Sequence, residues 1–181
     1  MTSNMAENGN VRTISNTDTP DGHDIHRSFR VENVSAVEPW VAQNSYLTEC
    51  EVLPTSWFFQ MTFQQAPENG PISWSVSLRR NDSNTDRPVK AFIWISFFDA
   101  SGQLLRFPKK LSNDGMLPGD EIYEYIPLCL PSGGLMNLPE QKLDVEVSIF
   151  IRFCHMKEDG TDAVANLSDD LNRMCFLWFL R

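Results

Sequence analysis

Histidine and cysteine are the residue types in this sequence best suited to metal binding or nucleophilic catalysis. They occur at His23, His26, His155, Cys50, Cys129, Cys154 and Cys175. His23 and His26 lie three residues apart, but no Cys or carboxylate motif nearby completes a site, so we predict no metal there. Cys154 and His155 are adjacent, and adjacent residues of a strand point to opposite faces. We therefore do not expect these two side chains to form a nucleophile–base pair.

Local catalytic and cofactor motifs are also missing from the sequence. There is no P-loop and no GxGxxG, GxSxG, HExxH or CxxC motif, and the acidic residues are scattered. We therefore predict a protein that is not an enzyme and that holds no cofactor and no metal. All-β sandwiches that lack a catalytic site usually bind other proteins, through the face or the edge of a sheet.

Length and composition indicate a single intracellular domain with tails. The chain has 181 residues, of which 41% are hydrophobic and 22% are charged, and its net charge is −9. This negative charge disfavours binding to nucleic acid and to anionic membranes. The polar start lacks the apolar segment of a signal peptide, and the apolar run at the end is shorter than a membrane helix. We expect reduced cysteines and a location in the nucleus or cytoplasm.

Short segments of alternating polarity predict an all-β fold. In "SWFFQMTF", "ISWSVSL" and "KLDVEVSIFIRF", apolar residues occupy every second position, which is the period of a half-buried strand. "VKAFIWISFFDASG" is apolar on both faces and ends in a turn at 99–102, while "FRVENV" and "EIYEYI" give further strands. The segments between them, including "SNDGMLPGD", are turn-like. We predict an antiparallel β-sandwich with a core that includes Trp57, Trp74, Val76, Phe97, Val147 and Ile149.

The predicted strands define the domain boundaries. Residues 1–23 are polar and lack apolar periodicity, so we expect a disordered arm. The domain covers 24–155, and 156–181 is a linker followed by a short helix. In that helix Asn166 or Ser168 is a candidate cap, and the apolar run 175–180 needs a partner surface.

The order of these segments resembles the MATH (TRAF homology) domain over 24–155. That family opens on a Trp-x-Ile/Val pattern followed by Asn and Ser, and "FRVENVS" keeps Val31, Asn33 and Ser35 but has Phe29 in place of Trp. The segments "SWFFQMTF", "WSVSLRR", "AFIWISFFDASG" and "LPEQKLDVEVSIF" follow in the family's order. The residues 167–174, "LSDDLNRM", resemble the start of the BTB/POZ domain that follows MATH in speckle-type POZ proteins and in TD and POZ relatives. The chain then departs from the pattern at Cys175, as a truncated coding sequence would. The other interpretation is a self-contained helix that docks on the sandwich.

The resemblance implies a substrate-recognition module of cullin-RING ubiquitin ligase adaptors, with a role in ubiquitin-dependent protein degradation. Such a module binds extended peptides of target proteins as an added strand. Cullin binding is not expected without the BTB domain. The residues aligned with the family's groove are Ser73, Ile95, Pro118, Gly119 and Asp120. Only Gly119 agrees with the family's Trp-Gly-Phe loop, and Asp120 would favour a basic peptide.

Two other interpretations remain open at this point. A MATH module without a BTB domain would act as a stand-alone scaffold, or as a decoy that occupies substrate without delivery to a ligase. An unrelated lectin-like sandwich would bind carbohydrate through exposed aromatic side chains, for which Trp40, Trp57, Trp74 and Trp94 are available. The strand pattern gives Trp57 and Trp74 buried neighbours, which favours a core position for both.

Overall fold

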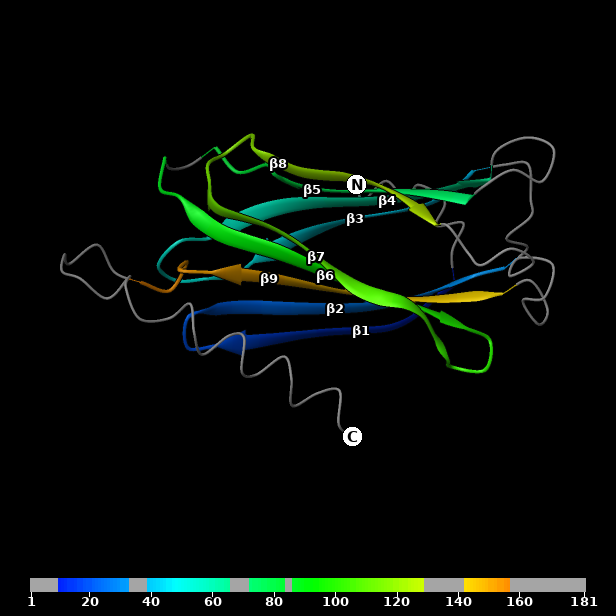
Figure 1. The fold of residues 1–181 in the computed structure, drawn as a ribbon. Coiled ribbons are helices and arrows are strands. Elements are labelled where there is room, and N and C mark those ends of the chain that lie inside the picture. Colours follow the sequence, from blue (N-terminus) through cyan, green and yellow to red (C-terminus); the bar gives the residue numbers. More distant parts are fainter. Residues whose placement is uncertain (1–9, 33–38, 66–71, 84–85, 129–141, 157–181) are drawn as a thin grey trace, which may run out of the picture.

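The computed structural model describes residues 10–32, 39–65, 72–83, 86–128 and 142–156. Within these residues it contains β-strands and no helix, arranged as two antiparallel sheets. The two sheets face one another as the layers of a sandwich (Figure 1). The predicted linker, the C-terminal helix and the first nine residues lie outside the described residues.

The larger sheet has five strands in the order β1-β2-β9-β6-β7. Its strands are β1 (Asn10–Thr19), β2 (Gly22–Val31), β9 (Leu143–Arg152), β6 (Val89–Asp99) and β7 (Leu104–Met116). β9 pairs with β2 on one side and β6 on the other, without interruption of the register. The predicted turn after β6 is present, and the Asp99 carboxylate accepts hydrogen bonds in it from Ser101 and from the Gln103 amide. These bonds lower the pKa of Asp99.

The smaller sheet has four strands in the order β3-β4-β5-β8. These are β3 (Trp40–Thr48), β4 (Thr55–Gln65), β5 (Ile72–Arg80) and β8 (Glu121–Leu128). Serines alternate with large apolar residues along β5, and the apolar residues face the other sheet. The serines therefore lie on the outer face of the molecule.

The core between the sheets confirms the alternation read from the sequence. All six residues predicted to be buried have at most 1% of their surface exposed. Trp74 lies at the centre of an aromatic group, with ring centroids 4.7 Å from Phe63 and 5.0 Å from Phe97. Because Phe63 belongs to the smaller sheet and Phe97 to the larger one, these rings join the two layers.

The N-terminal arm is a correction to the sequence analysis. Residues 10–19 form β1, which pairs with β2 through a turn at Pro20 and Asp21. β1 is the outermost strand of its sheet, and the side chains of residues 15–18 are exposed. An edge strand stabilised by its backbone ladder needs no apolar alternation, which explains why composition alone suggested disorder.

β7 (Leu104–Met116) includes part of a segment predicted to be a turn. The composition of "SNDGMLPGD" predicts a turn, but β7 continues through Gly115 to Met116, and the turn itself follows at 117–120. β7 is an edge strand with irregular register against β6. An edge position tolerates Pro108, and bulges accommodate the Asn-Asp-Gly segment.

Gly22 lies against the backbone of β9 with no room for a side chain, and it supplies a test of the register. A Cβ built on Gly22 would lie 1.8 Å from the carbonyl oxygen of Ile151, so the backbone of β9 would have to move. We expect Gly22→Ala to cost about 1–3 kcal/mol of folding free energy. Urea denaturation measures this loss, with Gly102→Ala as a contrast, because a Cβ at Gly102 meets open space and its cost comes only from the positive φ. An unchanged midpoint for Gly22→Ala would contradict the β2–β9 register.

Candidate functional site: the open edge of β8

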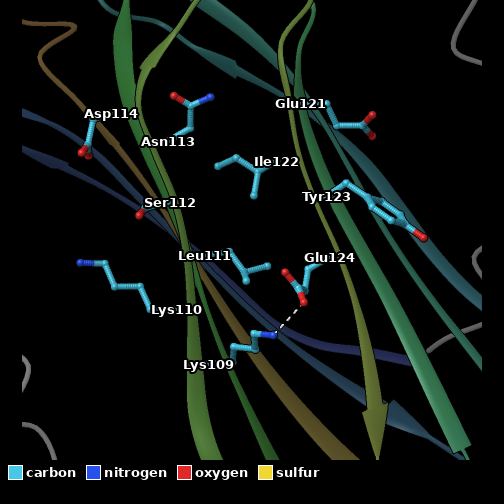
Figure 2. A pocket seen from close by; sticks show the side chains of 10 residues that line it. All are labelled: Lys109, Lys110, Leu111, Ser112, Asn113, Asp114, Glu121, Ile122, Tyr123 and Glu124. Carbon is cyan, nitrogen blue, oxygen red and sulfur yellow. Dashed lines mark hydrogen bonds and ion pairs between the residues drawn. The ribbon is translucent and has the colours of Figure 1, made fainter.

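β8 is one of the two edge strands of the smaller sheet, and β3 is the other. β8 pairs with β5 on one side, and no strand among the described residues pairs with its other side. The neighbouring edge of the larger sheet is β7. An open cleft of about 690 Å³, lined by 109–114 and 121–124, lies between β7 and β8. Figure 2 shows the two strands on opposite sides of it.

The floor of the cleft is apolar and its rim is charged. Leu111 and Ile122 point into the gap and are largely buried (Figure 2). At the rim Nζ of Lys109 lies 2.9 Å from Oε1 of Glu124, an ion pair that joins the two edges. Both side chains of this pair are about a third exposed, so the pair contributes little to stability.

The outer face of β8 carries two exposed aromatic side chains. Tyr123 is 62% exposed and Tyr125 is 55% exposed. They lie opposite Ser77 and Ser75 of β5, so a polar surface of small residues extends from the tyrosines across the sheet. Together β8, its two tyrosines and the adjacent serines form what we call the β8 surface.

Ser73 belongs to the β8 surface, but the other sequence-predicted residues are placed differently. Ser73 lies opposite Pro127 near the far end of β8, and its hydroxyl donates to the carbonyl of Gln64. Pro118, Gly119 and Asp120 form the turn before β8. Seven residues of strand separate that turn from Ser73 along β5, a distance of roughly 20 Å. The structure therefore does not gather these residues into one pocket.

The turn at 117–120 has a structural explanation for each of its polar groups. Gly119 has a φ of +92°, a conformation that L side chains rarely adopt, and its amide donates to the carbonyl of Arg80. The carboxylate of Asp120 accepts a hydrogen bond of 2.9 Å from the amide of Leu117. Asp120 thus holds the turn that starts β8.

Ile95 is not at a binding surface. It is fully buried in the core of the larger sheet, between Ile93 and Phe97 on the inward face of β6. A peptide cannot reach it without separation of the two sheets, so its assignment to the groove is a correction. The four tryptophans in the described residues give little support to a carbohydrate site either, because Trp40, Trp57 and Trp74 are buried and Trp94 is only partly exposed.

The assumption that Cys154 and His155 point to opposite faces is a further correction. β9 ends at Arg152, and Phe153 has a φ of +70°, so the backbone leaves the extended conformation before Cys154. The rule that adjacent strand residues face opposite ways does not apply beyond that point. Ligand atoms of Cys154 and His155 consequently lie together with those of His23 and Cys50.

The described residues contain no helix long and apolar enough to cross a membrane. Neither a protein-family model nor a curated protein sequence matches this chain.

Proposed function

We propose that this chain captures extended segments of target proteins, which add as a strand to β8. This is the binding mode that its resemblance to MATH-domain substrate adaptors implies. The proposal is supported by the location of the resembling segments. Their described parts overlap β2, β4, β5, β6 and β9, which contribute to both layers of one antiparallel sandwich.

The observation that carries the proposal is the pair of exposed tyrosines on an edge strand. Tyrosine combines a large apolar ring with a polar tip and loses little conformational entropy on binding, which makes it a frequent anchor at interfaces. Tyr123 and Tyr125 expose more than half of their surface beside backbone groups that no described strand uses. A peptide strand would place alternate side chains against these rings.

The backbone of β8 is oriented for this addition. The amide of Arg80 donates to the carbonyl of Asp120 at 3.0 Å, which fixes the first hydrogen-bonded pair between β5 and β8. The register continues without a shift along β8, so hydrogen-bonded and non-hydrogen-bonded pairs alternate from there. This alternation directs the N–H and C=O groups of Tyr123 and Tyr125 away from β5, toward a peptide.

Charge gives the peptide its expected composition. The chain has a net charge of −9, Glu121 is exposed at the start of β8, and Glu124 lies on the rim of the cleft. Complementary charge speeds association and suppresses wrong partners. We therefore expect peptides that combine aliphatic or aromatic residues with Lys or Arg.

The competing interpretation is a protected edge. Natural sheets place charged residues on their edge strands to prevent pairing with other chains, and Lys109, Glu121 and Glu124 would serve that purpose. The two interpretations differ in the tyrosines, because protection needs charge alone and gains nothing from two exposed aromatic rings.

A peptide selection followed by titration distinguishes the two interpretations. Random peptides are displayed and selected on the full chain, and a synthetic copy of a selected peptide is titrated by fluorescence anisotropy. We expect the double variant Tyr123→Ala/Tyr125→Ala to weaken binding at least tenfold, because truncation of an aromatic anchor typically costs about 2 kcal/mol. The corresponding Tyr→Phe variants keep the rings and should retain most of the affinity.

The matched control is Leu47→Ala on β3, the opposite edge of the same sheet. Leu47 is 75% exposed, so its removal tests whether any exposed apolar residue on an edge has the same effect. We expect unchanged affinity for this variant. Selection of no peptide, or equal affinity of the tyrosine double variant, would contradict the proposal.

A further inference from the structure

Four side chains of types that bind metals lie together just beyond the end of β9. Figure 1 shows where β9 ends in the sandwich. His23 is the second residue of β2, Cys50 follows β3, and Cys154 and His155 follow β9. His23 and both cysteines are buried, and His155 is partly buried. Two thiols and two imidazoles are the donor set of structural zinc sites.

The distances among the ligand atoms are close to those of a tetrahedral site. All four ligand atoms lie within 4.8 Å of one another, and Nε2 of His23 lies 3.0 Å from Nε2 of His155. Zinc bonds of about 2.0–2.3 Å place tetrahedral ligands roughly 3.3–3.8 Å apart. Shifts of an ångström or less at the side chains would therefore complete the coordination.

The orientation of His23 is fixed by a carboxylate. Its Nδ1 lies 2.7 Å from Oδ1 of Asp18, across the β1–β2 hairpin. In neutral imidazole, an Nδ1–H that donates to Asp18 leaves the Nε2 lone pair free, and Nε2 is the atom that faces the cluster. Metal-ligating histidines commonly have such a carboxylate partner, which fixes the tautomer and strengthens the ligand.

The Cys50 and Cys154 side chains are buried, so a metal ion is a better partner for their thiols than water. The amide of Leu53 approaches Sγ of Cys50 at 3.4 Å, and the Cys50 thiol donates to the carbonyl of Cys154 at 3.1 Å. Two buried thiolates are costly alone, but together they neutralise one divalent cation.

The backbone that carries Cys154 and His155 is anchored on both sides. The amide of Phe153 donates to the carbonyl of Asp21 at 2.8 Å, and Nη2 of Arg87 donates to the carbonyls of Phe153 and Met156. Arg152 bonds the carbonyl of His23 at 3.0 Å. These contacts hold the ligands in place without a metal, which reduces the ordering cost of binding.

We propose that His23, Cys50, Cys154 and His155 bind a structural zinc ion. Cys50 belongs to the β3–β4 connection of the smaller sheet, whereas the other three ligands extend from strands of the larger sheet. The ion therefore cross-links the two sheets at one end of the sandwich. The site replaces our expectation of no metal, which rested on local spacing around His23 and His26, and it is independent of peptide binding at β8.

Metal content of the purified full chain is the first test. We expect about one zinc per chain after expression with zinc and purification without chelator, and loss of that zinc in Cys50→Ser and in His155→Ala. His26→Ala is the matched control, because His26 lies on the same strand as His23 but bonds Ser148 on the outer face. It should keep the metal. Zinc retained by Cys50→Ser, or absent from the wild type, would overturn the proposal.

Thermal unfolding supplies an independent readout. Chelator-treated protein should gain about 5–10 °C in melting temperature when free zinc reaches a hundredfold excess over its dissociation constant. Asp18→Asn should bind zinc more weakly, about 10–100-fold, because it removes the partner that orients His23. Co²⁺ in place of zinc should give the visible absorption of a tetrahedral thiolate site.

A disulfide between Cys50 and Cys154 is the alternative use of these thiols. Intact mass of the non-reduced protein detects it as the loss of two hydrogens. A disulfide together with no zinc-dependent change in melting temperature would overturn the proposal, whereas free thiols and a zinc-dependent rise would support it.

Discussion

The Arg80→Ala variant is expected to lose about 3–5 kcal/mol of folding free energy, because it breaks an ion pair in the interior of the sandwich. The Arg80 side chain has no exposed surface, and that of Asp82 is only 4% exposed. Nε of Arg80 donates to Asp82 at 2.9 Å, and Nη1 donates to the carbonyls of Arg87 and Met116, each at 2.7 Å. Alanine would leave a buried carboxylate and two carbonyls without these donors.

The neighbouring arginine is the control for Arg80. Arg79 is exposed on the opposite face of β5, so Arg79→Ala removes the same charge and should change stability by no more than about 0.5 kcal/mol. Guanidinium denaturation followed by circular dichroism compares the two variants. For a chain of this size, the loss in Arg80→Ala corresponds to a melting temperature lower by roughly 6–20 °C. Similar midpoints for the two variants would show that the ion pair is not a structural element.

The second large effect is expected for Trp74→Ala, at about 3–5 kcal/mol. Trp74 has no exposed surface, and it contacts rings from both sheets. Its removal leaves a cavity between two layers that cannot easily collapse. Circular dichroism in urea measures the loss without relying on tryptophan fluorescence.

A Trp74→Phe variant separates ring packing from the indole N–H. Nε1 of Trp74 is buried and has no hydrogen-bond partner among the described residues. Phenylalanine keeps most of the ring contact and removes that polar group, so we expect a clearly smaller loss than for alanine. An equal loss of folding free energy in the two variants would show that the shape of the indole, rather than the volume it fills in the core, accounts for the loss.

Alternation along the sequence was sufficient to predict the core but not the edges of the sheets. Trp57, Trp74 and Val76 were assigned to the correct face because a strand with one buried face shows a period of two. β1 and β7 are the edge strands of the larger sheet, so few of their side chains need to be apolar. Their sequences are therefore rich in polar and turn-forming residues, and they give a weak signal for strand pairing. Edge strands are therefore the elements that composition describes least well.

For the candidate sites too, local sequence patterns predict some features, whereas others depend on contacts between distant segments of the chain. The alignment with the family placed Ile95 in the peptide groove. However, Ile95 lies two residues from Phe97 and therefore on the same face of the strand, which is the face in the core. The tyrosines of β8 were visible in "EIYEYI", but their exposure depends on where the strand lies in its sheet. The four proposed zinc ligands come from three distant segments, and the turn at Phe153 that unites two of them has no local motif.

Backbone amide hydrogen exchange on the peptide complex tests peptide addition at β8 most directly. With a selected peptide bound to the full chain, we predict slower exchange at the amides of Tyr123 and Tyr125, which an added strand would use as hydrogen-bond donors. The amides of Val41 and Leu47 on β3, the opposite edge of the same sheet, should exchange at the rate of the free protein. Slower exchange on β3 with no change on β8 would contradict the account.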